Sequence, residues 1–140
     1  MTRDDIAAVF AEREKLWNSH DTAAFAAHHS ERGEVTSPIF GTVHGRDAIE
    51  KSYRNLFKTF VDWDFRGEDP VIDGQRAAQG FTVHMTHAAE IFGVPSSGRR
   101  LEIHGVLLFE FDADGKIARE RRVYDFTGML IQAGVLKAKP

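Results

Sequence analysis

The stretch from Phe81 to Asp125 constrains the fold of this chain most, because it has the pattern of three consecutive antiparallel strands. Residues 81–91 alternate between apolar and polar side chains, which is the period of a strand with one buried face. Two further apolar runs follow over residues 101–111 and 116–125, and Asp114-Gly115 between them is a strong hairpin signal. The segment therefore predicts a three-stranded antiparallel meander that covers a core.

The turns of this meander predict a row of titratable side chains on its core face. If Asp114-Gly115 forms a two-residue loop, His104 lies opposite Asp125. If the preceding loop is symmetric about Pro95-Ser96, His87 lies opposite His104 and within reach of it across the strands. A slip of one residue would turn a strand over. The middle strand does not decide this register, because both of its faces are apolar.

The sequence before the meander has the apolar period of amphipathic helices. Thr2 begins a plausible capping box with Asp5, and Asp21 can cap a second helix. We expect helices over residues 2–17, 22–29 and 47–60, a short strand over 34–37, a loop over 39–45, and a strand over 63–72 that turns at Asp73-Gly74. Helices first and strands afterwards predict an α+β fold. This fold is a cone-shaped, curved antiparallel sheet of four main strands and a short one, wrapped by three N-terminal helices around an apolar cavity. Residues 1–140 are expected to form a single domain.

Composition narrows the classes of function. The chain has no cysteine, which excludes disulfides and thiolate chemistry. Its net charge of −3 predicts no nucleic acid or membrane partner, and no apolar run approaches the roughly 18 residues of a membrane span. Charges at Arg3, Asp4 and Asp5 lie where a signal peptide needs an apolar core, so we expect a cytoplasmic protein. A solvated or salt-bridged face is expected for Arg99, Arg100, Arg119, Arg121 and Arg122.

Short motifs follow one another in a fixed order between Trp17 and Val135. They are Trp17…His20-Asp21, Gly45-Arg46-Asp47-Ala48-Ile49, Thr86-His87, Phe92-Gly93-Val94-Pro95 with Ser97-Gly98-Arg99, Asp114-Gly115-Lys116-Ile117, and Tyr124-Asp125…Gln132-Ala133-Gly134-Val135. In order and spacing they resemble the SnoaL-like polyketide cyclase family, within the nuclear transport factor 2-like (ketosteroid isomerase-like) superfamily. The resemblance implies an α+β cone that forms a homodimer through its sheet.

The resemblance also implies a chemistry. In characterised cyclases of the family, an aspartate on the last strand is the general acid/base of an intramolecular aldol ring closure, and Asp125 is the matching position. A histidine on the preceding strand assists, and His104 is the match. The chain would then be an enzyme that acts on a small apolar carbonyl compound as a cyclase, isomerase or hydratase. No phosphate loop, nucleophile elbow or nucleotide fingerprint is present, so we expect no cofactor.

Each candidate residue also has a purely structural interpretation. Asp125 could instead cap the following helix, and His104 could be a core histidine with a satisfied hydrogen bond. A metal site of His87, His104 and Asp125 is conceivable, but no further ligand supports it and we expect none. Whether the chain is an enzyme stays open, because a non-catalytic domain that binds a small hydrophobic molecule fits the same cavity. The expected substrate-binding residues are His87, Tyr53, Trp17, Phe40, Trp63 and Met85.

Overall fold

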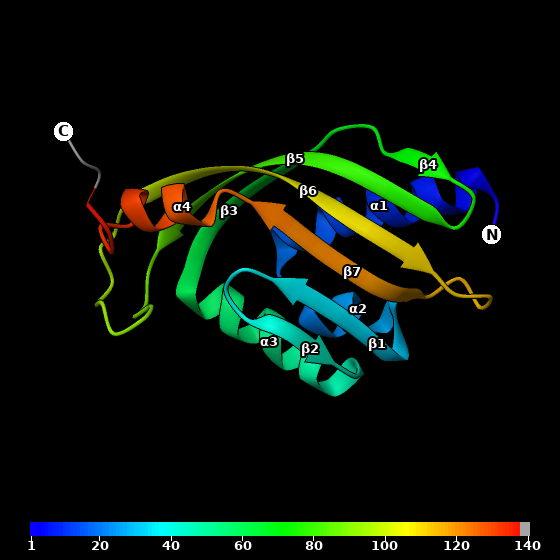
Figure 1. Ribbon diagram of the computed structural model, residues 1–140, viewed down its shortest axis with the longest axis horizontal. Helices are drawn as coiled ribbons and strands as arrows, with labels where there is room; N and C mark the ends of the chain where they lie inside the picture. The colour runs from blue at the N-terminus through cyan, green and yellow to red at the C-terminus, as the bar shows by residue number, and fades with distance from the viewer. Residues whose placement is uncertain (138–140) are drawn as a thin grey trace.

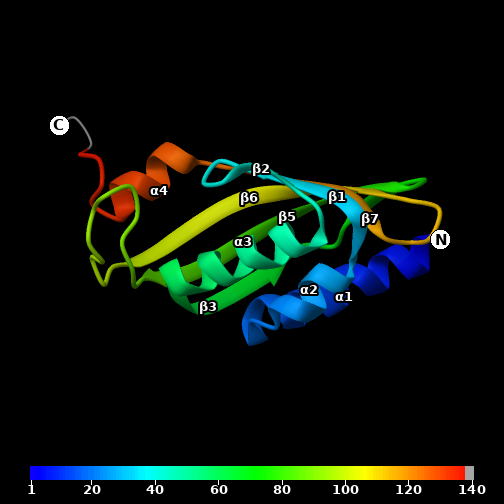
Figure 2. The same ribbon diagram turned by 90° about the horizontal axis from the view of Figure 1, so that it is seen from below.

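A large curved sheet forms one layer of the protein, and the first three helices lie together on one side of it (Figure 1 and Figure 2). The computed structural model describes residues 1–137. The elements follow one another as α1 (Arg3–Ser19), α2 (Thr22–Ala27), β1 (His29–Ser37), β2 (Gly41–His44), α3 (Arg46–Thr59), β3 (Phe60–Gly67), β4 (Val71–Asp73), β5 (Arg76–His87), β6 (Arg100–Phe111), β7 (Ile117–Tyr124) and α4 (Phe126–Gln132). The predicted α+β fold with a curved sheet is confirmed.

The strands are ordered β2-β1-β7-β6-β5-β3, and β4 pairs with β5 beside this path. Within this order β3, β5, β6 and β7 form the predicted antiparallel meander. β1 lies parallel to β7, although the whole meander separates the two strands in the chain. Residues from the beginning and from the end of the chain therefore share one part of the core.

The register of the meander agrees with the prediction at one hairpin and differs at the other. From Gly105 to Glu110, β6 pairs with β7 in the predicted register, with Val106 opposite Val123, but a bulge at Phe111 follows and the turn is longer than the predicted two residues. On the other side of β6, His104 lies opposite Thr82 and not opposite His87, so this part of the prediction is wrong. The loop between β5 and β6 is not symmetric, because Ile91 and Val94 close a small turn of their own within it. The observed pairing of β5 with β6 differs from the predicted one by five residues. Because side chains alternate between the two faces of a strand, an odd difference turns the opposite face of β6 toward the core.

The strand and helix counts differ slightly from the prediction. The expected loop around Thr42 is the short strand β2, which pairs with β1 through the turn at residues 38–40. Glycine has a low strand propensity, and it begins β2 and directly follows it, so the sequence carries only a weak strand signal there. Gly41 and Gly45 both adopt positive φ angles. The expected single strand over residues 63–72 is divided into β3 and β4.

Helix starts follow the expected capping chemistry. The Thr2 hydroxyl accepts a hydrogen bond from the Asp5 N–H (3.1 Å), and the Asp5 carboxylate accepts one from the Thr2 N–H (2.7 Å). This is the predicted capping box of α1. The Asp21 carboxylate accepts from the Ala24 N–H at 3.0 Å and caps α2, also as predicted.

The last helix, α4, begins directly after β7 at Asp125. The Asp125 Oδ1 accepts a hydrogen bond from the Gly128 N–H at 2.9 Å, which is the capping role that the sequence left open. The Gln132 side chain then ties the far end of α4 to β6, since it accepts from the Glu102 N–H (2.8 Å) and donates to the Glu102 carbonyl (2.9 Å). Over residues 1–137, no helix combines the length and the apolar composition that crossing a membrane requires.

The cap at Asp125 gives a stability prediction. Asp125→Ala should lower the free energy of unfolding by about 1 kcal/mol, because the Gly128 N–H loses its acceptor. Asp125→Asn keeps an acceptor oxygen at the same place and should cost much less. Urea denaturation of the two variants measures the difference, and equal losses for both would contradict the capping role.

Candidate functional site

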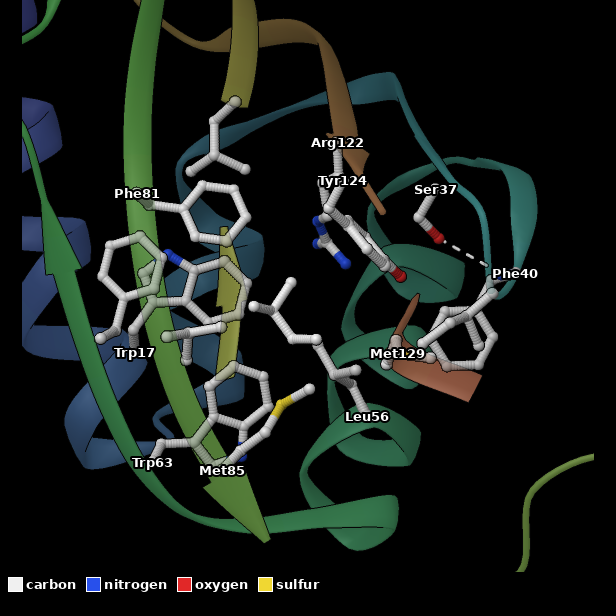
Figure 3. A pocket seen from close by; sticks show the side chains of 15 residues that line it. Trp17, Ser37, Phe40, Leu56, Trp63, Phe81, Met85, Arg122, Tyr124 and Met129 are labelled. Atoms are coloured by element: carbon white, nitrogen blue, oxygen red, sulfur yellow. Dashed lines mark hydrogen bonds between the residues drawn. The ribbon is translucent and has the colours of Figure 1, made fainter. Parts of the chain in front are cut away.

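A cavity lies between the inner face of the sheet and the helices that cover it (Figure 3). Its volume is about 50 Å³, and its walls are almost entirely apolar. The side chains that line it are Trp17, Ser37, Ile39, Phe40, Leu56, Trp63, Phe65, Phe81, Val83, Met85, Ile103, Leu107, Arg122, Tyr124 and Met129. They come from α1, α3, α4, the β1–β2 turn and five strands, so the cavity exists only in the folded chain.

Strand periodicity explains which sheet residues reach the cavity. Phe81, Val83 and Met85 alternate along β5 and share the buried face. Gly105 on β6 leaves room for one of them, since a Cβ at this position would lie 2.7 Å from Cζ of the Phe81 ring and 2.6 Å from the Val123 carbonyl oxygen. The absence of a side chain at Gly105 therefore allows the Phe81 ring to lie over β6.

A buried ionic cluster adjoins the cavity, and Glu120 is at its centre. Glu120 is fully buried, and its Oε1 accepts a hydrogen bond from Arg13 Nη2 at 2.7 Å. Its Oε2 accepts from Arg122 Nε at 2.6 Å. The Tyr53 hydroxyl accepts from the same Arg13 nitrogen at 2.7 Å and donates to Glu120 Oε1 at 3.1 Å. These four residues, from α1, α3 and β7, will be called the Glu120 cluster.

The protonation states of the cluster follow from its surroundings. Burial raises the pKa of Glu120, but the Arg122 and Arg13 guanidinium groups outweigh burial and hold it at about 2. Burial raises the pKa of Tyr53, so its hydroxyl is neutral. His29 Nε2 lies 3.5 Å from Glu120 Oε1, but burial lowers the pKa of His29 to about 3 and keeps the imidazole neutral.

The cluster consequently carries an excess positive charge at neutral pH. Two guanidinium groups face one carboxylate, and the adjacent Tyr53 and His29 are neutral. Aromatic faces stabilise part of this charge: the Arg13 Cζ lies 4.9 Å from the centres of two phenylalanine rings, and the Arg122 Cζ lies 4.8 Å from that of Tyr53. The charge is still not balanced by any second carboxylate within the cluster.

Arg122 is the cluster member that also lines the cavity. It is only 8% exposed, and its guanidinium group points into the space among the lining side chains (Figure 3). Its Nη2 is fully buried and has no hydrogen-bond partner among residues 1–137. An unpaired donor of a charged group in an apolar enclosure is costly, and an acceptor on a ligand would remove that cost.

Tyr124 lies two residues after Arg122 on the same face of β7 and also lines the cavity. Burial raises its pKa to about 12, so the phenol is neutral at pH 7 and able to donate a hydrogen bond. Ser37 has a different role, because its hydroxyl accepts from the Phe40 N–H at 3.2 Å and holds the β1–β2 turn (Figure 3).

Four of the expected substrate-binding residues line the cavity, namely Trp17, Phe40, Trp63 and Met85. Their contact with a substrate stays a prediction. Tyr53 is buried, and its hydroxyl is used within the Glu120 cluster. His87 is buried but is not among the residues that line the cavity, and its Nδ1 accepts a hydrogen bond from the Ser97 N–H at 3.2 Å.

The structure does not bring His104 and Asp125 together in the cavity. The His104 side chain is 68% exposed on the outer face of the sheet, with its Nδ1 3.0 Å from the Thr82 hydroxyl and its Nε2 3.3 Å from Glu102. Asp125 is exposed at the start of α4. The predicted row of His87, His104 and Asp125 on the core face is therefore wrong, because the β5–β6 register differs.

The sequence interpretation missed Arg122 and Glu120 as buried residues. The sequence predicts a solvated edge or a salt-bridged face for Arg122; it does form a salt bridge, with Glu120, but inside the protein. A signal was present in the β6–β7 register, which was predicted correctly. That register places Glu120 opposite Phe109 and Arg122 opposite Leu107, on the apolar face of β6. Burial of that face of β6 therefore implies burial of both residues.

Ligands for a metal ion do not gather in the described part of the chain. Among residues 1–137, no group of three or more histidine, cysteine, aspartate or glutamate side chains has a geometry suited to a metal. The residues of the conceivable site lie apart, since His87 is buried while His104 and Asp125 are exposed.

Comparison with known proteins supports the fold and identifies the family of this chain. A family model described as "SnoaL-like domain" matches residues 4–120. TsrD from Streptomyces laurentii has a similar structure, with a TM-score of 0.84, 22% identity, and coverage of 97% of this chain and 99% of that chain. AclR, a proposed hydroxylase from Streptomyces galilaeus, has a TM-score of 0.79 and 27% identity over 95% of this chain and 83% of that chain.

A proposed polyketide cyclase from Pseudomonas putida has a TM-score of 0.72 and 26% identity, over 86% of this chain and 91% of that chain. No curated protein sequence matches this chain. The match of the family model covers most of the 140 residues and agrees with the curved sheet and its helices. The chain belongs to the family of SnoaL-like domains.

Proposed function

We propose that this protein binds a small apolar carbonyl compound in the cavity and that Arg122 polarises the carbonyl oxygen for cyclase- or isomerase-type chemistry. The observation that carries the proposal is the unpaired Nη2 of Arg122 within an apolar enclosure. Family membership supports the reaction class, because proposed polyketide cyclases are among the similar structures.

The chemistry that this arrangement supports is electrostatic. When a carbonyl compound forms an enolate, negative charge develops on its oxygen, and a fixed cationic donor stabilises that charge more than it stabilises the neutral substrate. The Nε bond to Glu120 and the aromatic contacts hold the Arg122 guanidinium in place before the ligand arrives. The neutral Tyr124 hydroxyl supplies a second donor on the same strand.

The size of the cavity requires some of its walls to move. A volume of about 50 Å³ is smaller than the roughly 150 Å³ of a cavity that takes up benzene. Met85 and Met129 are the adaptable parts of the wall, because methionine side chains change rotamer easily. We expect a ligand to displace these two side chains and to leave the strands in place.

A non-catalytic ligand-binding role is the second candidate, and one observation favours it. Among the described residues that line the cavity, none is a carboxylate or an imidazole. A general acid/base role for Asp125 and His104 stays a prediction from the resemblance, since both side chains lie outside the cavity. Turnover separates the two candidates, because a pure binding protein returns its ligand unchanged.

The homodimer expected from the resemblance stays part of the proposal. Val106 and Val123 are paired on β6 and β7, and both are exposed on the outer face of the sheet. A second copy on this face would bury them while the cavity on the inner face stays accessible.

Arg122 gives the first functional prediction. Small bicyclic ketones at a hundredfold excess over Kd should stabilise the wild type by about 2.7 kcal/mol, measured as a rise in Tm. Arg122→Gln keeps a donor for Glu120 but removes the charge, and it should weaken ketone binding roughly 10- to 100-fold, because a charge-assisted hydrogen bond is worth about 1.5–3 kcal/mol.

Arg121→Gln is the matched control, since Arg121 is the next residue on β7 and points to the outer face. It should bind ketones as the wild type does. Mass spectrometry of the incubated ketones then separates an enzyme from a binding protein. Equal affinity of the Arg122 and Arg121 variants for ketones would contradict the proposed contact.

The neutral His29 predicts a dependence of stability on pH. Burial lowers the pKa of His29 from 6.5 to about 3, so below pH 6.5 the unfolded chain binds a proton that the folded chain does not. The free energy of unfolding is therefore highest above pH 6.5. It decreases as pH falls toward 3, by up to about 1.4 kcal/mol per pH unit. The pKa of Glu120 is lowered from 4.5 to about 2, so its contribution adds to the loss below pH 4.5.

Urea denaturation at several pH values between 5 and 7 checks this. His29→Phe removes the imidazole, and its stability should fall less steeply with decreasing pH than that of the wild type. The slope should not vanish, because burial also lowers the pKa of His20 and His28. An unchanged slope in His29→Phe would contradict the lowered pKa of His29, because the residue would then bind its proton equally in the folded and unfolded states.

A further inference from the structure

The loop between β5 and β6 holds a serine against a buried histidine, at the end of the molecule where α4 also lies (Figure 1). The His87 N–H donates a hydrogen bond to the Arg99 carbonyl at 2.9 Å. The His87 carbonyl accepts from the Gly98 N–H and from the Ser96 hydroxyl, both at 3.0 Å. The chain is therefore fixed to His87 on both sides of Ser97.

The Ser97 hydroxyl lies between a base and a hydrogen-bond donor. Its Oγ is 2.9 Å from Nδ1 of His87 and accepts a hydrogen bond from the Arg99 N–H at 3.2 Å. The same Nδ1 also accepts from the Ser97 N–H at 3.2 Å, so it carries no proton in the neutral imidazole. Because Nδ1 has no proton to give, the hydroxyl is the donor of this pair and directs its proton at the ring.

The two members of the pair differ in their access to solvent. Ser97 is exposed, whereas His87 is 0% exposed. A reagent from solution can therefore reach the hydroxyl but not the ring. A serine or cysteine at about 2.6–3.2 Å from an imidazole has the geometry of an activated nucleophile, because the ring can take the proton as the oxygen or sulfur attacks.

We propose that Ser97 is a nucleophile that accepts an acyl group from activated acyl donors, aryl esters or thioesters, with His87 as its base. The Ser97 Oγ attacks the acyl carbon, and the hydroxyl proton passes to Nδ1 of His87. The bond from the acyl carbon to the aryl oxygen or thiol sulfur breaks, and the leaving group takes the electron pair and then the proton. The products are an O-acyl serine and a free phenol or thiol.

This reaction is a function separate from that of the cavity. Neither Ser97 nor His87 is among the residues that line the cavity, and the β5–β6 loop contributes no side chain to its walls. Acylation of Ser97 therefore neither requires nor excludes the binding of a carbonyl compound beside Arg122.

Two features restrict the donors to those with a good leaving group. His87 Nε2 is buried without a partner among residues 1–137, so no carboxylate there stabilises the imidazolium that forms. The N–H groups of residues 97–99 are all used within the loop, so none of them is free to stabilise an oxyanion. Because the same aids are missing when water attacks the acyl group, we expect the acyl serine to accumulate.

The test is the reaction with 4-nitrophenyl acetate, whose leaving group is yellow when it is ionised. We expect a burst of one equivalent of 4-nitrophenolate per chain, followed by a much slower release. Peptide mapping by mass spectrometry should place an acetyl group on Ser97, and it counts acetylated lysines separately. Phenyl acetate, which has a poorer leaving group, should acetylate Ser97 far more slowly.

Ser96→Ala is the matched control, because the Ser96 hydroxyl donates to a backbone carbonyl and faces no base. The backbone hydrogen bonds between His87 and the loop remain in this variant. The burst should persist in Ser96→Ala and disappear in Ser97→Ala. Both positions are exposed, so neither variant is expected to unfold the protein.

His87→Asn assigns the base, because an asparagine oxygen can accept a hydrogen bond but cannot take the proton. Acetylation of Ser97 should be about 100-fold slower in this variant. If His87→Asn does not fold, the comparison of the two serine variants still decides. Acetyl groups found only on lysines and the N-terminal amine, or equal acetylation of Ser96 and Ser97, would overturn the inference, as would an unchanged rate in a folded His87→Asn.

Discussion

The ion pairs of Glu120 with Arg13 and Arg122 are the interaction on which the rest of the site depends. Both carboxylate oxygens are used, and the three charged groups are almost inaccessible to solvent. Removing one partner of a buried ion pair leaves an uncompensated charge inside the protein, which is strongly destabilising. Helix α1 and strand β7 must therefore meet at one fixed position, and α3 joins them through the Tyr53 hydroxyl.

This interaction also determines the character of the cavity. Most of its walls are apolar side chains, which make a hydrophobic space but give a ligand no orientation. Arg122 adds one directional, charged donor at the border between the cluster and the cavity. An enclosed charge acts strongly because little water screens it, and the contact of Arg122 with Glu120 keeps the guanidinium group in position.

Much of the fold could be predicted from local sequence, and the candidate site much less. Thr2, Asp5 and Asp21 predicted helix starts correctly because capping depends on neighbours within four residues. The Asp-Gly turn located the β6–β7 hairpin for the same reason, and the predicted register holds from Gly105 to Glu110, beyond a bulge at Phe111. The loop before β6 forms an internal turn at Ile91 and Val94 that its composition does not reveal. Because of this loop, the β5–β6 register differs from the predicted one by an odd number of residues, and His104 lies on the surface instead of in the core.

The sequence by itself determined the α+β class, the antiparallel meander, the helix caps and the family, because each follows from periodicity, turn residues or motif order. Only the tertiary structure decided which charged residues are buried. Arg13 and Glu120 are far apart in the chain, and their contact arises because β1 pairs in parallel with β7 and the helices then pack on that side of the sheet. Local patterns carry no information about such a contact, since the energy of a buried ion pair depends on partners that only the complete fold brings together.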